Sequence, residues 1–156
     1  MNINIISVGK IREKYIKLGI DEFSKRLIPY SSVKITEIPA EDMKTDCVAE
    51  KVLQREGEKI LGKIRENTYV VVLDVAGKKL SSEKFARELD GISTKGINQV
   101  AFVIGSSEGL ANEVKSRADL LISFSDMTFP HQLMRLILLE QIYRAFKILK
   151  NEPYHR

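Results

Sequence analysis

Apolar residues along the chain recur with two different periods, one typical of β-strands and the other typical of α-helices. A strand-like run precedes Gly9, and apolar residues then return at helical spacing until Pro29. A second strand is expected before Pro39, and a polar stretch separates it from a long charged helix. The first half therefore predicts a strand over 2–8, a helix over 16–27, a strand over 33–38, a loop over 40–46 and a helix that carries Val52, Ile60 and Ile64.

Three nearly continuous apolar runs follow in the second half, over 69–75, 100–104 and 120–124. Such runs are typical of strands that are buried on both faces, as in a parallel sheet. Short helical intervals over 82–89 and 111–117 separate them. Because strands alternate with helices, the sequence predicts an α/β fold in which a parallel sheet is flanked by helices.

The last predicted helix, 131–150, is apolar on more than one side. One stripe consists of Leu139, Ile142, Tyr143, Phe146 and Leu149, and a second set wraps the first half of the helix: Leu133, Met134, Leu136, Ile137 and Leu138. One sheet cannot cover all of this surface. Either the helix lies inside a larger core, or a second copy of the chain covers it. We favour a homodimer, because symmetric pairs are the commonest oligomers and a large apolar patch needs cover.

The composition of the 156 residues, with 44% hydrophobic and 29% charged residues, excludes collagen-like and low-complexity chains. We expect one globular domain over 1–156. The single cysteine, Cys47, cannot form an internal disulfide. The first twenty residues lack the basic start of a signal peptide, and no uncharged apolar stretch approaches the ~20 residues of a membrane span. A cytoplasmic protein without a membrane anchor is therefore expected. One cysteine and two histidines are too few for a zinc site, so no metal is expected.

The formal net charge of +4 is modest, but the basic residues gather toward the two ends of the chain. Residues 1–40 and 127–156 each carry an excess of three positive charges, and both histidines lie in the second of these segments. A charge of this size is compatible with an ordinary solvated surface as well as with a nucleic-acid partner.

Three of the predicted strands end in loops that are small, polar or glycine-containing. The turn after 100–104 has glycines at Gly105 and Gly109, and the loops 74–78 and 124–131 have the same character. Ligands of α/β sheets bind at the carboxyl ends of parallel strands, so the three loops together predict a cleft for a small cofactor. Each glycine is equally explained by a tight turn that needs a positive φ.

His131 is expected in the first turn of the last helix, with Pro130 at its start and Thr128 as a cap. The positive end of the helix would favour the neutral imidazole. A surface or capping histidine is the alternative. The chain ends in an aromatic, an imidazole and a guanidinium group, at Tyr154, His155 and Arg156. Such groups stack on bases and hold phosphates, although chain ends are often simply frayed.

At these same positions the sequence resembles the bacterial ribosomal RNA large subunit methyltransferase H family, which belongs to the SPOUT class of knotted methyltransferases. The resemblance runs from 5–10 through 29–30, 56–57 and Leu73 to the last residue, and its most specific segments are 104–105, 108–110, 127–135, 140–145 and 153–156. It implies a homodimer with a C-terminal trefoil knot. It also implies transfer of a methyl group from S-adenosyl-L-methionine to N3 of a pseudouridine in 23S rRNA, within the assembled 70S ribosome.

The resemblance also implies roles for individual residues. The cofactor-binding positions are Leu73, Gly105, Phe124, Ser125, Asp126, Met127, Thr128 and Phe129. Ser106 stands where family members often have a second glycine. We expect His131 to accept or relay the proton lost from the target base, with Arg135 beside it in the catalytic region. Arg135, Tyr154, His155 and Arg156 are expected to hold the RNA.

Two other functions remain compatible with the residues alone. The chain could be a regulator that holds a different nucleotide without chemistry, or a dimeric ribosome-binding factor with a vestigial pocket. Titration with S-adenosylmethionine, ATP and NAD distinguishes the first, and RNA binding without turnover distinguishes the second.

Overall fold

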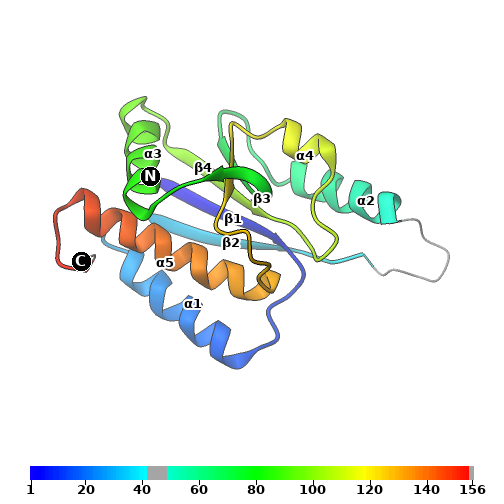
Figure 1. Ribbon diagram of the computed structural model, residues 1–156, viewed down its shortest axis with the longest axis horizontal. Helices are drawn as coiled ribbons and strands as arrows, with labels where there is room; N and C mark the ends of the chain where they lie inside the picture. Colours follow the sequence, from blue (N-terminus) through cyan, green and yellow to red (C-terminus); the bar gives the residue numbers. More distant parts are fainter. Residues whose placement is uncertain (42–48, 155–156) are drawn as a thin grey trace.

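Five parallel strands form one sheet in the order β2-β1-β4-β3-β5 (Figure 1). The computed structural model describes residues 1–41 and 49–154. Most of the predicted loop over 40–46, and also Cys47, His155 and Arg156, lie outside the described residues. The strands are β1 (Asn2–Val8), β2 (Ser32–Ile38), β3 (Tyr69–Lys79), β4 (Gln99–Ile104) and β5 (Leu120–Ser123).

Helices cover both faces of this sheet, as Figure 1 shows. They are α1 (Lys14–Leu27), α2 (Ala49–Leu61), α3 (Ser82–Thr94), α4 (Asn112–Ser116) and α5 (His131–Leu149). One face packs against α1, α3 and α5, and the opposite face packs against α2 and α4. The alternation of strand side chains between the two faces produces two separate apolar clusters, one on each side of the sheet.

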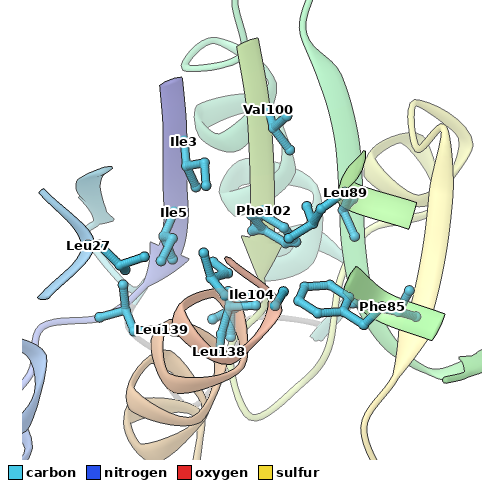
Figure 2. Close-up of a cluster of buried hydrophobic side chains, with 14 of the residues drawn as sticks. Ile3, Ile5, Leu27, Phe85, Leu89, Val100, Phe102, Ile104, Leu138 and Leu139 are labelled. Atoms are coloured by element: carbon cyan, nitrogen blue, oxygen red, sulfur yellow. The ribbon is translucent and has the colours of Figure 1, made fainter. Parts of the chain in front are cut away.

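The larger cluster lies under α5 (Figure 2). Ile5 and Phe102 point from the sheet toward Leu138 and Leu139 of α5, and Phe85 closes the cluster from α3. All five side chains are at most 5% exposed. Burial of side chains of this size stabilises the folded chain by about 1.5–3 kcal/mol each, so α5 is fixed on the sheet along its whole length.

The predicted α/β fold with a parallel sheet is confirmed, and three element boundaries differ from the prediction by three residues or more. Ile64 lies beyond the end of α2, in the segment that leads to β3. The strand predicted over 69–75 continues to Lys79, and the helix predicted over 82–89 continues to Thr94. Both extensions consist mostly of polar residues. The apolar pattern did not predict them, because solvent-facing residues carry little periodic signal.

The end of β3 passes unusually close to β5. Ile122 is in register with two residues of β3, Leu73 and Lys78, because the register shifts between them. A Cβ atom on Gly77 would lie only 2.5 Å from the backbone of Ile122. Glycine is therefore required here by close approach of two backbones rather than by a turn.

We expected a second copy of the chain to cover α5; within one chain, α1 and α3 already cover it in part. The helix lies between α1 and α3 (Figure 1), and a Cβ atom on Gly19 of α1 would touch the side chain of Leu136. No residue of α5 is fully exposed, although Ile137 and Phe146 are among the many that are only half-buried. In the described part of the chain, no helix combines the length and the apolar character that a membrane crossing needs.

We expect Gly77→Ala to lower the free energy of unfolding by about 1–3 kcal/mol, because the new methyl group would collide with backbone atoms that cannot move aside. Urea denaturation measures the change. Gly91→Ala is the matched control: nothing lies within 4 Å of a Cβ atom on Gly91, so alanine inside α3 should raise the free energy by up to about 1 kcal/mol. Equal stability of Gly77→Ala and the native chain would contradict the close approach.

Candidate functional site

A pocket of about 250 Å3 lies at the carboxyl ends of β3, β4 and β5, which are neighbours in the sheet. This volume is just below the range of about 300–1,000 Å3 that small-molecule sites usually have. Its walls are mainly apolar, with a few hydroxyl groups between them. The residues that line it are Leu73, Asp74, Val75, Ile104, Gly105, Ser106, Ser107, Gly109, Leu110, Ile122, Ser123, Phe124, Ser125, Met127, Thr128, Phe129 and Met134.

The structure brings seven of the eight predicted cofactor residues together around this pocket: Leu73, Gly105, Phe124, Ser125, Met127, Thr128 and Phe129. Asp126 does not line it. Its exposed carboxylate instead forms an ion pair with Lys79 at the end of β3. Ser107 and Met134 line the pocket without having been predicted, since their residue types carry no signal for a ligand.

The turn after β4 joins the pocket to α2. A Cβ atom on Gly105 would lie 2.4 Å from the carbonyl oxygen of Gly109, and Gly109 itself has a φ of +96°. The tight-turn explanation therefore holds for Gly109 through its positive φ, and close approach of the backbone explains Gly105; both glycines also line the pocket. Ser106 donates a hydrogen bond of 2.9 Å to Glu56 Oε2, and the other oxygen of this carboxylate accepts from the backbone N–H of Glu41 at 3.1 Å.

Glu56 is a site residue that the sequence pattern did not single out for a function. It is only 3% exposed, although it lies on a charged helix. A buried carboxylate needs hydrogen-bond partners, and here they are the turn that follows β4 and the start of the segment after β2. Glu56 thus fixes one wall of the pocket.

The loop from Phe124 to Phe129 is shaped by its own hydroxyl groups. Ser123 donates to the carbonyl oxygen of Ser125 at 3.1 Å, and the Ser125 hydroxyl accepts from the N–H of Met127 at 2.9 Å. Met127 is 72% exposed at the mouth of the loop. The prediction that Thr128 caps α5 is wrong, because Pro130 occupies the N-cap position and no side chain caps the helix.

His131 is half-buried and lies at the end of β1 rather than in the pocket wall. Its Nε2 atom is 3.4 Å from the position that a Cβ atom on Gly9 would occupy. The pKa of His131 is lowered first by burial and then by the positive charge of Arg135, while Glu56 opposes the shift. The neutral imidazole was therefore expected correctly, but burial is the main cause instead of the helix end.

Arg135 cannot hold RNA in this structure, which corrects the prediction. Its side chain is completely buried. It donates to Glu37 Oε1 at 3.0 Å and to the carbonyl oxygens of Val8 and Gly9 at 2.8 and 2.7 Å. Burial lowers the pKa of Arg135, and the charge of Glu37 opposes that shift. The sequence does not predict the burial of Arg135, because the helical spacing of the apolar residues around it does not show whether the arginine points toward solvent or toward the sheet.

The C-terminal tail packs on α5 as far as Tyr154, so the frayed-end alternative is wrong up to this residue. The Tyr154 hydroxyl donates to Glu140 Oε1 at 3.1 Å, and its ring meets the ring of Tyr143 edge-on at 4.9 Å. The Arg144 guanidinium lies 4.9 Å from the centre of the Tyr154 ring. Stacking of Tyr154 on a base would require these contacts to open.

The start of α5, near the pocket, and the segment that follows its last residue lie at opposite ends of this helix (Figure 1). His131 begins the helix and Tyr143, which contacts Tyr154, lies about 18 Å further along at 1.5 Å per residue. Within the described residues, the structure therefore does not bring the predicted RNA-binding tail to the pocket. Nor do three metal-binding side chains gather anywhere in that part of the chain.

Comparison with known proteins agrees with this geometry. A family model described as "Predicted SPOUT methyltransferase" matches residues 1–155. The chain is 52% identical to the Ribosomal RNA large subunit methyltransferase H of Clostridioides difficile (strain 630) and 53% identical to the protein of the same name from Exiguobacterium sp.. It is 51% identical to that of Finegoldia magna. Each alignment covers 100% of this chain and 100% of the relative.

A match of this length leaves no part of the described fold unaccounted for, and it coincides with the sheet and the strand-end pocket described above. The chain therefore belongs to the SPOUT methyltransferases, in the family of ribosomal RNA large subunit methyltransferase H.

Proposed function

We propose that the chain transfers a methyl group from S-adenosylmethionine to N3 of a pseudouridine in 23S rRNA, acting on the assembled ribosome in the cytoplasm. The observation that carries the proposal is the pocket at the three strand ends, in a chain that belongs to a methyltransferase family throughout its length. Relatives with about half of their residues in common bear the name of a ribosomal RNA large subunit methyltransferase. A regulator without chemistry is disfavoured by this membership.

The residues of the pocket fit S-adenosylmethionine by their chemistry. Leu73, Ile104 and Phe124 offer apolar walls that suit an adenine ring, and the hydroxyls of Ser125 and Thr128 suit the polar parts of the molecule. When bound, the sulfonium supplies a methyl group that is already activated for transfer. The chain therefore has to orient the reactants and keep water away, tasks that the apolar walls and the clamped turn after β4 perform.

One proton must leave N3 of the pseudouridine, and we assign its acceptance or relay to His131. The lowered pKa keeps the imidazole neutral at pH 7, so Nδ1 or Nε2 can accept a proton. His131 is two residues from Phe129 and three from Met134, which both line the pocket. A base at the mouth of the pocket would therefore lie near the imidazole.

The proposal includes a deep trefoil knot in the C-terminal half of the chain, within a single domain over 1–156. The close passage of β3 past β5 supports it, since Ile122 has register partners on both sides of the shift in β3. The general rule against threaded chains would otherwise argue against a knot.

We also propose a homodimer as the active form. Tyr15 and Leu18 on α1 are 64% and 60% exposed, and half-buried apolar residues continue this surface along α5. A second copy would cover them. It could also bring its tail to this pocket, which the chain's own tail does not reach. Sedimentation equilibrium should give twice the mass of one chain; a monomer at micromolar concentration would contradict the dimer.

We expect His131→Gln to lower the single-turnover rate of methyl transfer roughly 100-fold, the scale of a general base. For the native chain the rate should rise with pH and level off below the ordinary histidine pKa of about 6.5, because the neutral form is active and burial lowers its pKa. The variant should lose this rise while its affinity for S-adenosylmethionine stays unchanged. An unaltered rate in His131→Gln would remove the role.

Deletion of 154–156 should abolish rRNA methylation and spare cofactor affinity. The contacts of Glu152 with Tyr30 and Lys147 remain in the shortened chain, so the C-terminal end of α5 should stay folded. Isothermal titration with S-adenosylmethionine and a methyl-transfer assay measure the two properties separately. If the deletion also removed cofactor binding, the tail would belong to the pocket instead.

The function itself is tested by incubating the chain with labelled S-adenosylmethionine and 70S ribosomes that lack this methylation, beside free 23S rRNA. Transfer to N3 of one pseudouridine, on ribosomes and not on free RNA, is expected. Absence of transfer despite measurable cofactor binding would favour a ribosome-binding factor with a vestigial pocket. Tighter binding of ATP or NAD than of S-adenosylmethionine would point to a nucleotide-binding regulator.

A further inference from the structure

The segment from the end of β1 to the first residue of α1 carries three exposed cations within five residues. These are Lys10, Arg12 and Lys14, and Glu13 is the one acidic residue among them. The described part of the chain contains no ion pair for any of the three side chains. Among residues 1–41 and 49–154, no ion pair therefore neutralises their charges.

The backbone of this segment is held by side chains from α5 and β2. The N–H of Arg12 donates to Gln132 Oε1 at 2.7 Å, and the N–H of Ile11 donates to Glu37 Oε1 at 3.1 Å. The same Glu37 oxygen accepts from Arg135, which also donates to the carbonyl oxygen of Gly9 at 2.7 Å. Hydrogen bonds thus fix the backbone at three positions, 9, 11 and 12.

The segment contributes little to the apolar core, because its one large apolar side chain, Ile11, is only half-buried where it packs against the larger cluster. Burial of a guanidinium such as Arg135 is costly, yet it is used to hold this segment. Cations on a backbone that is already ordered lose less freedom when they bind a partner. The clamp therefore prepares Lys10, Arg12 and Lys14 for binding.

The clamped segment lies beside the pocket. β1 ends at the same edge of the parallel sheet as β3 and β4, and the loop after β1 passes the start of α5 (Figure 1). His131 separates the two regions, since it touches Gly9 on one side and follows the pocket residue Phe129 on the other. A nucleotide whose base lies at the mouth of the pocket would carry its neighbouring phosphates past this segment.

We propose that Lys10, Arg12 and Lys14 bind phosphates of the RNA strand that flanks the target nucleotide. The inference rests on the proposed function, because it takes RNA as the substrate, and it adds a second contact surface to the C-terminal tail. RNA is favoured over a further protein partner because three cations match a phosphate backbone, whereas stable protein interfaces bury apolar and aromatic anchors. The exposed aromatic residue beside the cations, Tyr15, belongs to the surface proposed above for the second copy of the chain.

The test replaces all three cations, as Lys10→Ala, Arg12→Ala and Lys14→Ala in one chain. The matched control is Lys63→Ala, Arg65→Ala and Lys95→Ala, which removes the same charges from exposed residues before β3 and β4, near the opposite edge of the sheet. Binding to 70S ribosomes and to an rRNA fragment that contains the target is measured across salt concentrations, and cofactor affinity is measured by calorimetry.

The first variant should bind RNA roughly tenfold more weakly or worse at low salt. Its slope of log K against log salt should become shallower by about 2, because each neutralised phosphate of a single strand accounts for ~0.7 of the slope. Its affinity for S-adenosylmethionine should be unchanged. The control variant should keep the slope and affinity of the native chain. If both variants lost the same RNA affinity, the loss would follow from the lower net charge alone, and the proposal would be overturned.

Gln132→Ala tests the clamp separately, because it removes the hydrogen bond from the Arg12 N–H and leaves all charges in place. We expect weaker RNA binding with an unchanged salt slope. If the native chain methylates ribosomes and the triple variant does so with the same KM and salt dependence, the surface proposal fails alone. If the native chain neither binds nor methylates RNA, both the surface proposal and the proposed function fail.

Discussion

The packing of α5 on one face of the parallel sheet is the interaction on which the site depends. Leu138, Leu139 and Ile142 are completely buried between the helix and the strands. Their burial fixes the start of the helix at the edge of the sheet where β1, β3 and β4 end. His131 and Arg135 reach the end of β1 from there, and Met134 closes the pocket. A small rotation of α5 about its axis would move the side chains of His131, Met134 and Arg135 together. The apolar contacts of α5 with the sheet therefore set the positions of these three side chains.

Charged groups that are hidden from solvent hold the loops around the pocket. Glu56 secures the turn after β4 through Ser106, and Arg135 with Glu37 secures the loop after β1. Both Glu56 and Arg135 are costly to bury. Both oxygens of Glu56 accept hydrogen bonds, and the two terminal nitrogens of Arg135 donate to Glu37 and to backbone carbonyls, whereas its Nε atom has no partner among the described residues. Loops that have little apolar surface of their own are ordered in this way. In the proposed reaction the methyl group on the sulfonium is already activated, so precise positioning by such loops would be the main contribution of the chain.

Residue pattern predicted most of the fold and the position of the pocket. The continuous apolar runs that became β3, β4 and β5 are typical of strands buried on both faces, and parallel strands bring their ends together at one edge. Leu73, Gly105 and Phe124 therefore lie around one pocket, as expected. The contacts of individual polar residues were harder to predict. Asp126 pairs with Lys79 at the surface, and Thr128 does not cap α5, because both outcomes depend on where a distant strand or a proline-started helix places its neighbours.

The sequence by itself determined the periodicity of the strands and helices, the apolar character of α5 and, through resemblance, the family, since these are properties of residue order. The tertiary structure alone decided which charges are buried. Arg135 faces β1 instead of RNA, Tyr154 folds onto α5, and Lys10 stands exposed beside the pocket. The reason is physical: a side chain's charge follows from the sequence, but its exposure and its partners depend on segments more than a hundred residues away, such as the 127 positions that separate Val8 from Arg135.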